Sequence, residues 1–426
     1  MNALSNSLLK QALAPGVHFE ATVPKRKIPF QTGVPLFIGF GQITGRAESV
    51  KNIADNTMVL NLTSQEQFEQ SVRIDIPGGF LDYAVRGFFE NGGRTCEVVT
   101  LPEVSGMPRL LEKLFEDKGA LEEIENIDLV CLPDLMAQEA DVYCDKVSHI
   151  QQQVLEYCRR MGDRFAILDT PSFYKVCKSD QLSGTAVKNN PWGQEILKYQ
   201  FNFSNKGLPV EGAIYFPWIY VKPLPRHRNA FRIRVPPSGH IAGIYARSDA
   251  AFGVHKAPAN EIVDGALDLE INMSDKSQVK LNNYGINCLR VFPGRGILVW
   301  GTRTLSGRAD WKYVNVRRLF LTLVRWSSHH LDDLVFEPHN EPLWHRVRDR
   351  VGDYCYDLYR RGALKGLTPS EAYFVKCDAE TNPPEVRNKG QLICEVGLAP
   401  VVPAEFIVVR IIQSPAGATA TIPNII

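Results

Sequence analysis

The sequence predicts a mixed α/β protein that contains more than one compact unit. The chain has 426 residues, and 44% of its residues are apolar, so it can bury about two or three hydrophobic cores. A strand-like apolar run at 127–132 precedes a long helical pattern at 138–161, and another strand-like run follows at 165–168. Strand, helix and strand in this order are typical of an α/β layer with parallel strands.

A period-2 pattern of apolar residues lies close to the N-terminus. Its apolar face consists of Val17, Phe19, Ala21 and Val23, and Pro24 ends it. This alternation predicts a strand. A strand so near a terminus needs a sheet, and two alternatives remain open: an edge strand in its own domain, or an arm that pairs with another chain.

The remainder of the first half predicts strands at 36–40 and 96–99 and a helix at 81–91. The stretch between the first of these strands and the helix is mostly polar and shows no clear element. Residues 171–235 are rich in proline, glycine and asparagine. We therefore expect loops and short strands there, on the outside of the middle part of the molecule.

Two amphipathic helices are predicted in the second half, because apolar residues recur there at helical spacing. Their apolar faces consist of Tyr313, Val316, Phe320 and Leu323 in the first helix, and of Leu343, Val347, Val351, Tyr354 and Leu358 in the second. Thr368-Pro369-Ser370-Glu371 indicates the start of a further helix. Closing strands are expected at 392–396 and 406–412, followed by a loose tail at 414–426.

Composition excludes several classes of function. Lysine plus arginine (48) nearly equals aspartate plus glutamate (47), so no overall charge favours nucleic acid or an anionic membrane. We find no apolar run of the roughly 20 residues that a membrane span needs and no signal-peptide pattern, and we expect folding in the cytoplasm. Nine cysteines without a C-x-x-C motif are expected to be reduced packing residues.

Glycine and histidine motifs do not predict a ligand site. Gly294-Arg295-Gly296 lacks the G-K-[ST] ending of a phosphate loop and leads into a strand-like run, so we interpret it as a tight turn. The densest histidine group shows no H-x-x-x-H spacing, and we expect no metal site. It consists of His329, His330, His339 and His345.

Asp169 is the best candidate for catalysis, because it directly follows a predicted strand, where α/β enzymes place catalytic groups. The sequence has no G-x-S-x-G nucleophile motif beside it. We therefore expect no enzyme activity, no catalytic residue and no cofactor, and we keep an α/β enzyme acting around Asp169 as an alternative.

The strongest signal is a series of short motifs in one order between residues 236 and 410. They are Pro236-Pro237-Ser238-Gly239-His240, Lys256-Ala257-Pro258-Ala259-Asn260-Glu261, Phe292-Pro293-Gly294-Arg295-Gly296, Val299-Trp300-Gly301, Tyr313-Val314-Asn315-Val316-Arg317-Arg318-Leu319-Phe320, Phe336-Glu337-Pro338, Val375-Lys376-Cys377-Asp378 and Asn382-Pro383-Pro384-Glu385. With these motifs the chain resembles the contractile tail-sheath family, the sheath subunits of phage tails, phage-tail-like bacteriocins and contractile injection systems.

The resemblance implies an inner α/β domain that is built from the N- and C-terminal parts of the chain and carries an inserted outer α/β domain. Extended arms at both ends would add strands to sheets of neighbouring subunits. The implied divisions are an N-terminal arm at 1–23, the start of the inner domain at 24–70, the outer domain at 71–245, the tube-facing inner domain at 246–403 and a C-terminal arm at 404–426.

The function that the resemblance implies is structural. Such a subunit polymerises as stacked hexameric rings around an inner tube, and the polymer contracts to drive the tube through a target envelope. The implied partners are further copies of the chain, the inner tube protein, baseplate and cap proteins, and sister sheath proteins, without direct contact to nucleic acid or membrane. The implied location is the bacterial cytoplasm during assembly, and then a phage tail or a tail-like particle.

The family pattern also assigns roles to particular residues. The arms would be Val17, Phe19, Ala21 and Val23 at one end and Phe406, Val408, Arg410 and Ile412 at the other. The receiving strands would lie among 297–300, 373–376 and 392–396. Contact with the tube would come from the helix at 341–361, through Arg346, Arg348 and Arg350. Arg346 and Arg350 share a helix face, and a merely solvated charged face is the alternative.

A rival within the same particles is a baseplate or sheath-terminating component that shares the fold and does not polymerise. Recognisable arms at both ends argue against this rival, because a terminator should lack a donor or an acceptor strand.

Overall fold

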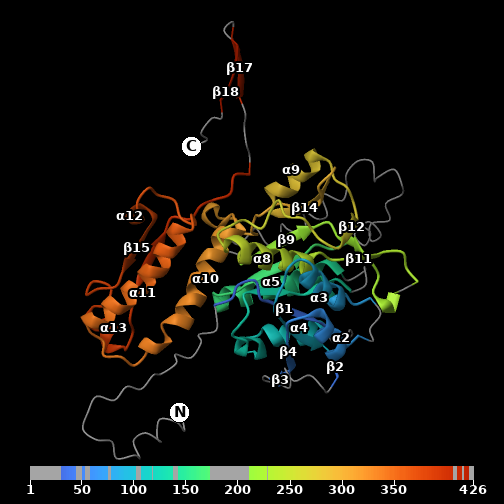
Figure 1. Cartoon of the computed structure of the whole chain (residues 1–426). Helices are drawn as coiled ribbons and strands as arrows, with labels where there is room; N and C mark the ends of the chain where they lie inside the picture. The colour runs from blue at the N-terminus through green and yellow to red at the C-terminus, as the bar shows by residue number, and fades with distance from the viewer. Residues whose placement is uncertain are drawn as a thin grey trace, which may run out of the picture. The chain divides into compact units, whose positions relative to one another are not determined.

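The structure is a computed structural model of the chain (Figure 1). It describes residues 30–44, 50–52, 58–74, 78–101, 107–117, 119–137, 143–172, 211–227, 229–405, 410–414 and 417–421. The expected N-terminal arm, with Val17, Phe19, Ala21 and Val23, lies outside the described residues, as do Phe406 and Val408.

A nine-stranded sheet in the order β14-β13-β9-β8-β7-β1-β6-β4-β3 is the centre of the fold. The strands are β1 (Pro35–Phe40), β3 (Val50–Asn52), β4 (Met58–Leu62), β6 (Cys96–Leu101), β7 (Leu129–Cys131), β8 (Phe165–Asp169), β9 (Gly212–Phe216), β13 (Ile286–Phe292) and β14 (Gly296–Trp300). Neighbouring strands from β13 to β6 in this order are parallel. The β14–β13, β6–β4 and β4–β3 pairs at the two ends of the sheet are antiparallel. Because helices cover both faces of the parallel part, β1, β8 and β9 are buried along their whole lengths.

Alternate residues of β1 belong to different cores. Leu36 and Ile38 pack with residues of α4 (Met107–Phe115) and α5 (Tyr143–Met161), whereas Phe37 packs with residues of α3 (Leu81–Glu90) and α8 (Ser238–Phe252). The period-2 geometry of a strand produces this division. One pair of helices therefore covers each face of the sheet.

Glycines let α3 and α8 approach each other closely. A Cβ atom at Gly239 would lie 2.3 Å from the carbonyl oxygen of Ala84, and one at Gly243 would lie 2.4 Å from that of Phe88. Neither position can hold a larger residue unless a backbone moves. This contact fixes the start of α8, which is the Pro236-Pro237-Ser238-Gly239-His240 motif.

Smaller elements surround the sheet. Two short sheets consist of β2 (Gln42–Ile43) with β5 (Val72–Arg73), and of β10 (Ile219–Val221) with β11 (Ile233–Val235) and β12 (Ala266–Leu269). The other helices here are α2 (Gln65–Ser71) and α9 (Asp275–Asn283), with 3-10 turns η2 (Ala120–Glu123), η3 (Pro133–Ala137), η6 (Pro225–His227) and η7 (Ala309–Trp311).

The C-terminal part is mainly helical, and in Figure 1 its two long helices run side by side. Its elements are α10 (Val314–His330), η8 (Asp332–Leu334), α11 (Glu341–Arg360), α12 (Pro369–Ala372), β15 (Tyr373–Lys376), α13 (Pro384–Asn388) and β16 (Glu395–Leu398). Trp326 of α10 stacks on Tyr354 of α11 with 4.3 Å between ring centroids. A buried cluster of Leu319, Leu358 and Leu364 continues this contact.

The chain ends in a β-hairpin. β17 (Arg410–Ser414) pairs antiparallel with β18 (Gly417–Thr421), and Arg410 lies opposite Thr421. A strand that includes Arg410 and Ile412 is therefore present, and the prediction of a loose tail is wrong for residues 414 and 417–421. Glycine and alanine are uncommon in strands, so the composition of 417–421 does not indicate β18.

Most predicted elements are confirmed. Strands expected at 36–40, 96–99, 127–132 and 165–168 are β1, β6, β7 and β8, and the long predicted helices are α3, α5, α10 and α11. The Gly294-Arg295-Gly296 turn joins β13 to β14, and the Arg295 amide donates to the Phe292 carbonyl (3.0 Å).

Two regions differ from the expectation. Residues 171–235 contain β9, which lies between β8 and β13 inside the large sheet rather than on the outside. The polar stretch before residue 81 contains β4 and α2. The expected division at residue 245 falls inside α8, and the large sheet takes strands from both sides of it.

A buried ion cluster connects α10 to α8 and to the start of β1. Arg318 donates two hydrogen bonds to Asp249 (2.9 and 2.6 Å) and one to Asp128 (3.0 Å). Asp128 also accepts the amides of Gly33 and Val34 at the start of β1 (3.0 and 2.6 Å). The cluster therefore joins residues from α8, from α10 and from the start of β1.

Asp169 has a structural role at the start of α8. Its Oδ1 accepts the Ser238 amide (2.9 Å), and its carbonyl accepts Nε2 of Gln151 (2.9 Å). The side chain is 2% exposed. A carboxylate at the first turn of a helix binds free amides and complements the helix dipole. These contacts give the acidic residue at the end of β8 a structural role.

Asp169 should make stability depend on pH. Burial raises its pKa from 3.8 to about 7, although the Ser238 hydrogen bonds lower it. Because the folded pKa is above the ordinary value, the contribution of this group is full below pH 3.8 and is lost as the pH rises through about 7. We expect Asp169→Asn to gain stability relative to the wild type between about pH 4 and about pH 8 in urea unfolding. A difference that stays constant over this range would contradict the assignment.

Candidate functional site

The expected receiving strands lie at sheet ends. β14 is the last strand of the nine-stranded sheet, whereas β15 and β16 form a separate two-stranded sheet. An unpaired edge exposes amides and carbonyls that can bind another chain. The backbone partners of each strand therefore decide which of them can accept an arm.

The outer edge of β14 is closed within the subunit. Val299 donates its amide to Glu261 (2.9 Å) and accepts the Asn260 amide (2.7 Å), and the Ile297 carbonyl accepts the Val263 amide (2.9 Å). Residues 260–263 thus occupy the place of an added strand. The prediction of a receiving strand at 297–300 is wrong for residues 297–299.

The β15–β16 pair, which we call the acceptor sheet, is open. Its register places Val375 opposite Val396. Next to the ladder, the Ala399 amide donates to the Ala372 carbonyl (2.9 Å), and hydrogen-bonded and non-hydrogen-bonded pairs alternate from there. Val375 and Val396 form a non-hydrogen-bonded pair, so their backbone groups point outward.

Among the described residues, no third strand pairs with β15 or β16 themselves. Residues 363–365 pair with 399–401, directly after β16. One face of the acceptor sheet packs against the α10–α11 helices through Tyr373 and Leu398, and on the other face Phe374 is 57% exposed. The sheet is therefore held by the helices and has an outward-pointing edge on each side. This arrangement suits two added strands.

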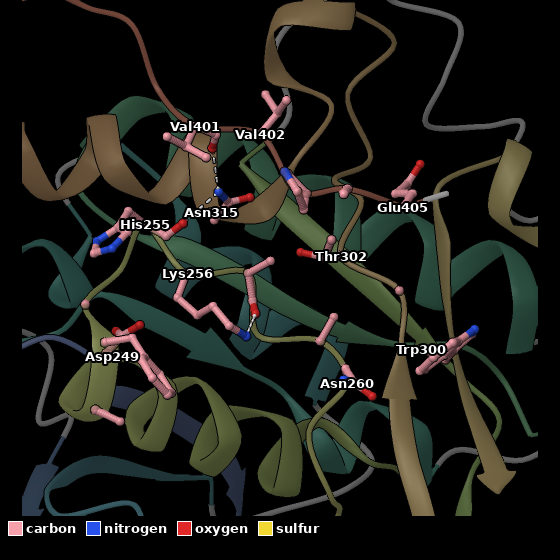
Figure 2. Close-up of a pocket in the computed structure, with 18 of the residues that line it drawn as sticks. Asp249, His255, Lys256, Asn260, Trp300, Thr302, Asn315, Val401, Val402 and Glu405 are labelled. Carbon is pink, nitrogen blue, oxygen red and sulfur yellow. Dashed lines mark hydrogen bonds between the residues drawn. The ribbon is translucent and has the colours of Figure 1, made fainter. Parts of the chain in front are cut away.

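A cleft of about 1100 Å³, which we call the arm-root cleft, lies where the C-terminal segment leaves the fold (Figure 2). Three of the sequence motifs converge on it. Its lining includes Lys256 and Asn260 from the motif at 256–261, Trp300 from the motif at 299–301 and Asn315 from the motif at 313–320. Residues 401–405 form the remaining side. Motifs that lie far apart in the sequence therefore surround the root of the C-terminal arm.

Asn315 joins three segments across this cleft. Figure 2 shows its side chain between His255 and Val401, and its Nδ2 donates to both carbonyls (2.8 and 3.1 Å). The residue is 3% exposed. The Val401 amide in turn donates to the Ala363 carbonyl (3.0 Å). The start of the arm segment is therefore fixed by hydrogen bonds before the chain reaches residue 405.

Glu405 is the last described residue of this segment. Arg303 donates to it with Nε (2.8 Å) and Nη2 (2.6 Å), and Tyr313 donates its hydroxyl (3.3 Å). Lys312 lies 3.6 Å away. Burial alone would raise the pKa of Glu405, but the hydrogen bonds and charges of Arg303 and Lys312 lower it. A two-point guanidinium contact gives direction as well as strength, so it fixes the orientation of the Glu405 side chain.

The arginines of α11 are partly exposed and paired within the chain. Nη2 of Arg346 lies 3.0 Å from Oε2 of Glu337, and Arg350 binds the His330 carbonyl (2.7 Å) and the Asp333 carboxylate. Both side chains therefore contact residues 330–337. Arg348 instead pairs with its neighbour Asp349 at 3.4 Å. Role assignments toward a tube stay predictions.

Possible metal ligands, cysteines and long helices are the other features of the described part of the chain that bear on function. Within the described ranges, no group of three or more histidine, cysteine, aspartate or glutamate side chains is arranged to hold a metal ion. The cysteines that the structure describes are free thiols, and most are buried. No helix in the described part is both long and apolar enough to cross a bilayer.

Two family models match the chain. The model for the phage tail sheath protein central domain matches residues 119–305, and the model for the phage tail sheath C-terminal domain matches residues 307–414. Together they cover well over half of the sequence. The chain belongs to the phage tail sheath protein family. This confirms the resemblance that the motifs indicate.

Individual relatives agree with the family. The tail sheath protein of Vibrio phage KVP40 is 24% identical over 251 residues, which are 56% of this chain and 36% of the relative. The chain thus spans just over a third of that sheath protein. Among solved structures it is similar to a chain of the anti-feeding prophage baseplate, with 28% identity, a TM-score of 0.69, and coverage of 95% of this chain and 100% of the other.

A second solved structure is the sheath complex of an extracellular contractile injection system, PVC, in its contracted state. The identity is 27% and the TM-score is 0.67, over 95% of this chain and 99% of that sheath chain. The mixed α/β fold class is therefore confirmed over nearly the whole chain.

Proposed function

We propose that this protein is the structural subunit of a contractile sheath, which polymerises as stacked hexameric rings around an inner tube and shortens to push the tube through an envelope. The open acceptor sheet is the observation that carries the proposal, because it offers unpaired edges on a rigid support. Family membership and the likeness to a contracted sheath complex support it.

Strand addition would connect the subunits. The acceptor sheet has two open edges, and the chain supplies two terminal arms, at 1–23 and 404–426. Each arm adds a strand to a neighbour's acceptor sheet. A strand of about five to seven residues makes a handful of backbone hydrogen bonds of roughly 1 kcal/mol each, so a connection holds while the bodies it joins rotate.

The arm-root cleft would set the direction of one connection. Asn315 and the Arg303–Glu405 pair fix the chain up to residue 405, and the arm begins directly afterwards. In this arrangement the rigid bodies move and the arm segments act as hinges. Energy for contraction would come from surface buried between subunits, without a nucleotide.

The tube-facing surface would lie on α11. Arg346, Arg348 and Arg350 are its proposed contacts, and Arg348 is the most available of them because its intramolecular partner is only its sequence neighbour. Charged contacts of this kind separate more readily than a large apolar interface, which suits a tube that slides. We place the boundary of this C-terminal domain near residue 306, where the two family matches meet.

The partners would be further copies of the chain, a tube protein, baseplate and cap proteins, and sister sheath proteins. Assembly would take place in the cytoplasm of the producing bacterium, and the product would be a phage tail or a tail-like injection particle. We also propose that the protein acts as a structural subunit and not as an enzyme.

A baseplate or terminator role is the second candidate, because the chain is also similar to a chain of a baseplate structure. Negative-stain electron microscopy separates the two. The full chain, expressed with a tube protein, should form long sheaths, and a variant that lacks residues 1–23 should not. Particles that stop after a single ring in the full chain would overturn the sheath proposal in favour of the baseplate role.

A further inference from the structure

Two cysteines lie opposite each other at one end of the acceptor sheet. Lys376, the last residue of β15, is paired with Glu395, the first residue of β16. The next position outward on each strand is a cysteine, Cys377 on one and Cys394 on the other. An antiparallel register therefore places these thiols directly across from each other.

The backbone geometry at this position suits a disulfide. Alternation from the Ala372–Ala399 hydrogen bond makes Cys377 and Cys394 a non-hydrogen-bonded pair. Ile393 gives independent support, because it donates its amide to Oδ1 of Asn382 (2.8 Å) and accepts Nδ2 (3.0 Å). Its backbone groups thus point toward the β15 side, and those of Cys394 point away. Such pairs have Cα atoms about 4.5 Å apart, within the roughly 4.4–6.8 Å that a disulfide spans.

The two thiols lie close enough to shift each other's pKa, and they differ in their surroundings. The thiols share a hydrogen bond, which lowers the pKa of Cys377 and, together with burial, raises that of Cys394. Nδ2 of Asn382 lies 3.9 Å from the Cys377 sulfur. Cys377 is 1% exposed, whereas Cys394 is partly exposed. Cys394 is therefore the sulfur that a reagent meets first, and Cys377 is the better nucleophile behind it.

We propose that Cys377 and Cys394 form a disulfide that ties β15 to β16 when the protein meets an oxidant of the small-molecule disulfide class. The Cys394 thiol gives up its proton, and its sulfur attacks the oxidant. The S–S bond of the oxidant breaks, a mixed disulfide forms, and one small thiol that takes up the proton leaves. The Cys377 thiolate then attacks the Cys394 sulfur, and the second small thiol leaves. The protein loses two electrons and two protons, and the oxidant gains both.

The bond would close the loop 378–393 and hold the end of the acceptor sheet together. Its effect on assembly rests on the proposed function: a clamped acceptor sheet keeps its two added strands longer, so oxidised sheaths should resist dissociation. The chemistry itself does not depend on that function, because it needs only the folded subunit.

The first test uses the full-length subunit, before any assembly. The protein is incubated with glutathione disulfide, remaining thiols are alkylated, and the digest is analysed by mass spectrometry. We expect one peptide pair that joins Cys377 to Cys394 and disappears after reduction. Alkylation of both cysteines in the oxidised, folded protein would overturn the proposal, as would a bond from either cysteine to Cys355.

Matched variants complete the test. Cys355→Ala removes a neighbouring buried thiol on α11 and should leave the linked peptide unchanged, and its loss there would overturn the assignment. Cys394→Ser should abolish the linked peptide and the oxidant-dependent rise in melting temperature. If the wild-type subunit forms the bond but assembled sheaths dissociate at the same rate when reduced or oxidised, the disulfide stands and the clamping role does not.

Discussion

Replacing Arg318 with methionine should lower the free energy of unfolding by about 3–5 kcal/mol. The change keeps most of the side-chain volume, but it leaves Asp249 buried without its cation and Asp128 with only Arg325, 4.0 Å away. Removing one partner of a buried ion cluster leaves the desolvation cost of the others in place. Urea unfolding followed by circular dichroism measures the loss.

The Arg318 deficit should depend on pH. Burial raises the pKa of Asp249, and the charge and hydrogen bonds of Arg318 oppose that rise. Without Arg318 the folded pKa increases further, and a raised acid pKa means stability that is lost as the pH rises. We therefore expect the deficit to grow from pH 5 to pH 8.

Arg346→Met is the matched control, because Arg346 is 49% exposed and pairs with Glu337 on the surface. Exposed ion pairs contribute about 0–1 kcal/mol. Equal losses in the Arg318 and Arg346 variants would contradict the role of the buried cluster.

Proline at position 396 or 375 should abolish sheath assembly and leave the subunit folded. At both positions the amide points away from the partner strand, so proline removes the donor of an open edge without breaking the β15–β16 ladder. Sedimentation and electron microscopy should show soluble subunits. Thermal unfolding should give melting temperatures within a few degrees of the wild type.

Val396→Ala and Val375→Ala are the controls for these proline variants, because they shorten the side chain and keep the amide. Both should assemble. Normal sheaths from Val396→Pro would show that the β16 edge receives no arm, and normal sheaths from Val375→Pro would show the same for β15. The pair of variants thus assigns each edge separately.

Sequence patterns predicted the elements that have strong periodicity. α10 and α11 carry apolar residues at helix spacing, and β1 is a short run of apolar residues; each lies where the pattern indicates. β9 was missed although it is a fully buried strand like β1. Its five residues, Gly212–Phe216, stand in a stretch rich in proline, glycine and asparagine, which resembles a loop.

The assembly surfaces were only partly predictable for a related reason. Residues 260–263 close the β14 edge through backbone atoms, and such pairing leaves no mark in side-chain periodicity. The Glu405–Arg303 contact joins residues that are about a hundred positions apart, which a single sequence cannot connect. The motifs that line the arm-root cleft can be recognised in the sequence, but only the fold shows that they lie together.

The strand-like segment at 260–263 also protects the protein before it is used. An uncovered edge on a nine-stranded sheet would let two copies pair edge to edge and aggregate. With Asn260 and Val263 bound to β14, this end of the large sheet offers no growth point. The covered edge thus protects the subunit against aggregation through the large sheet, and under the proposed function the small sheet beside α11 is the place where copies join.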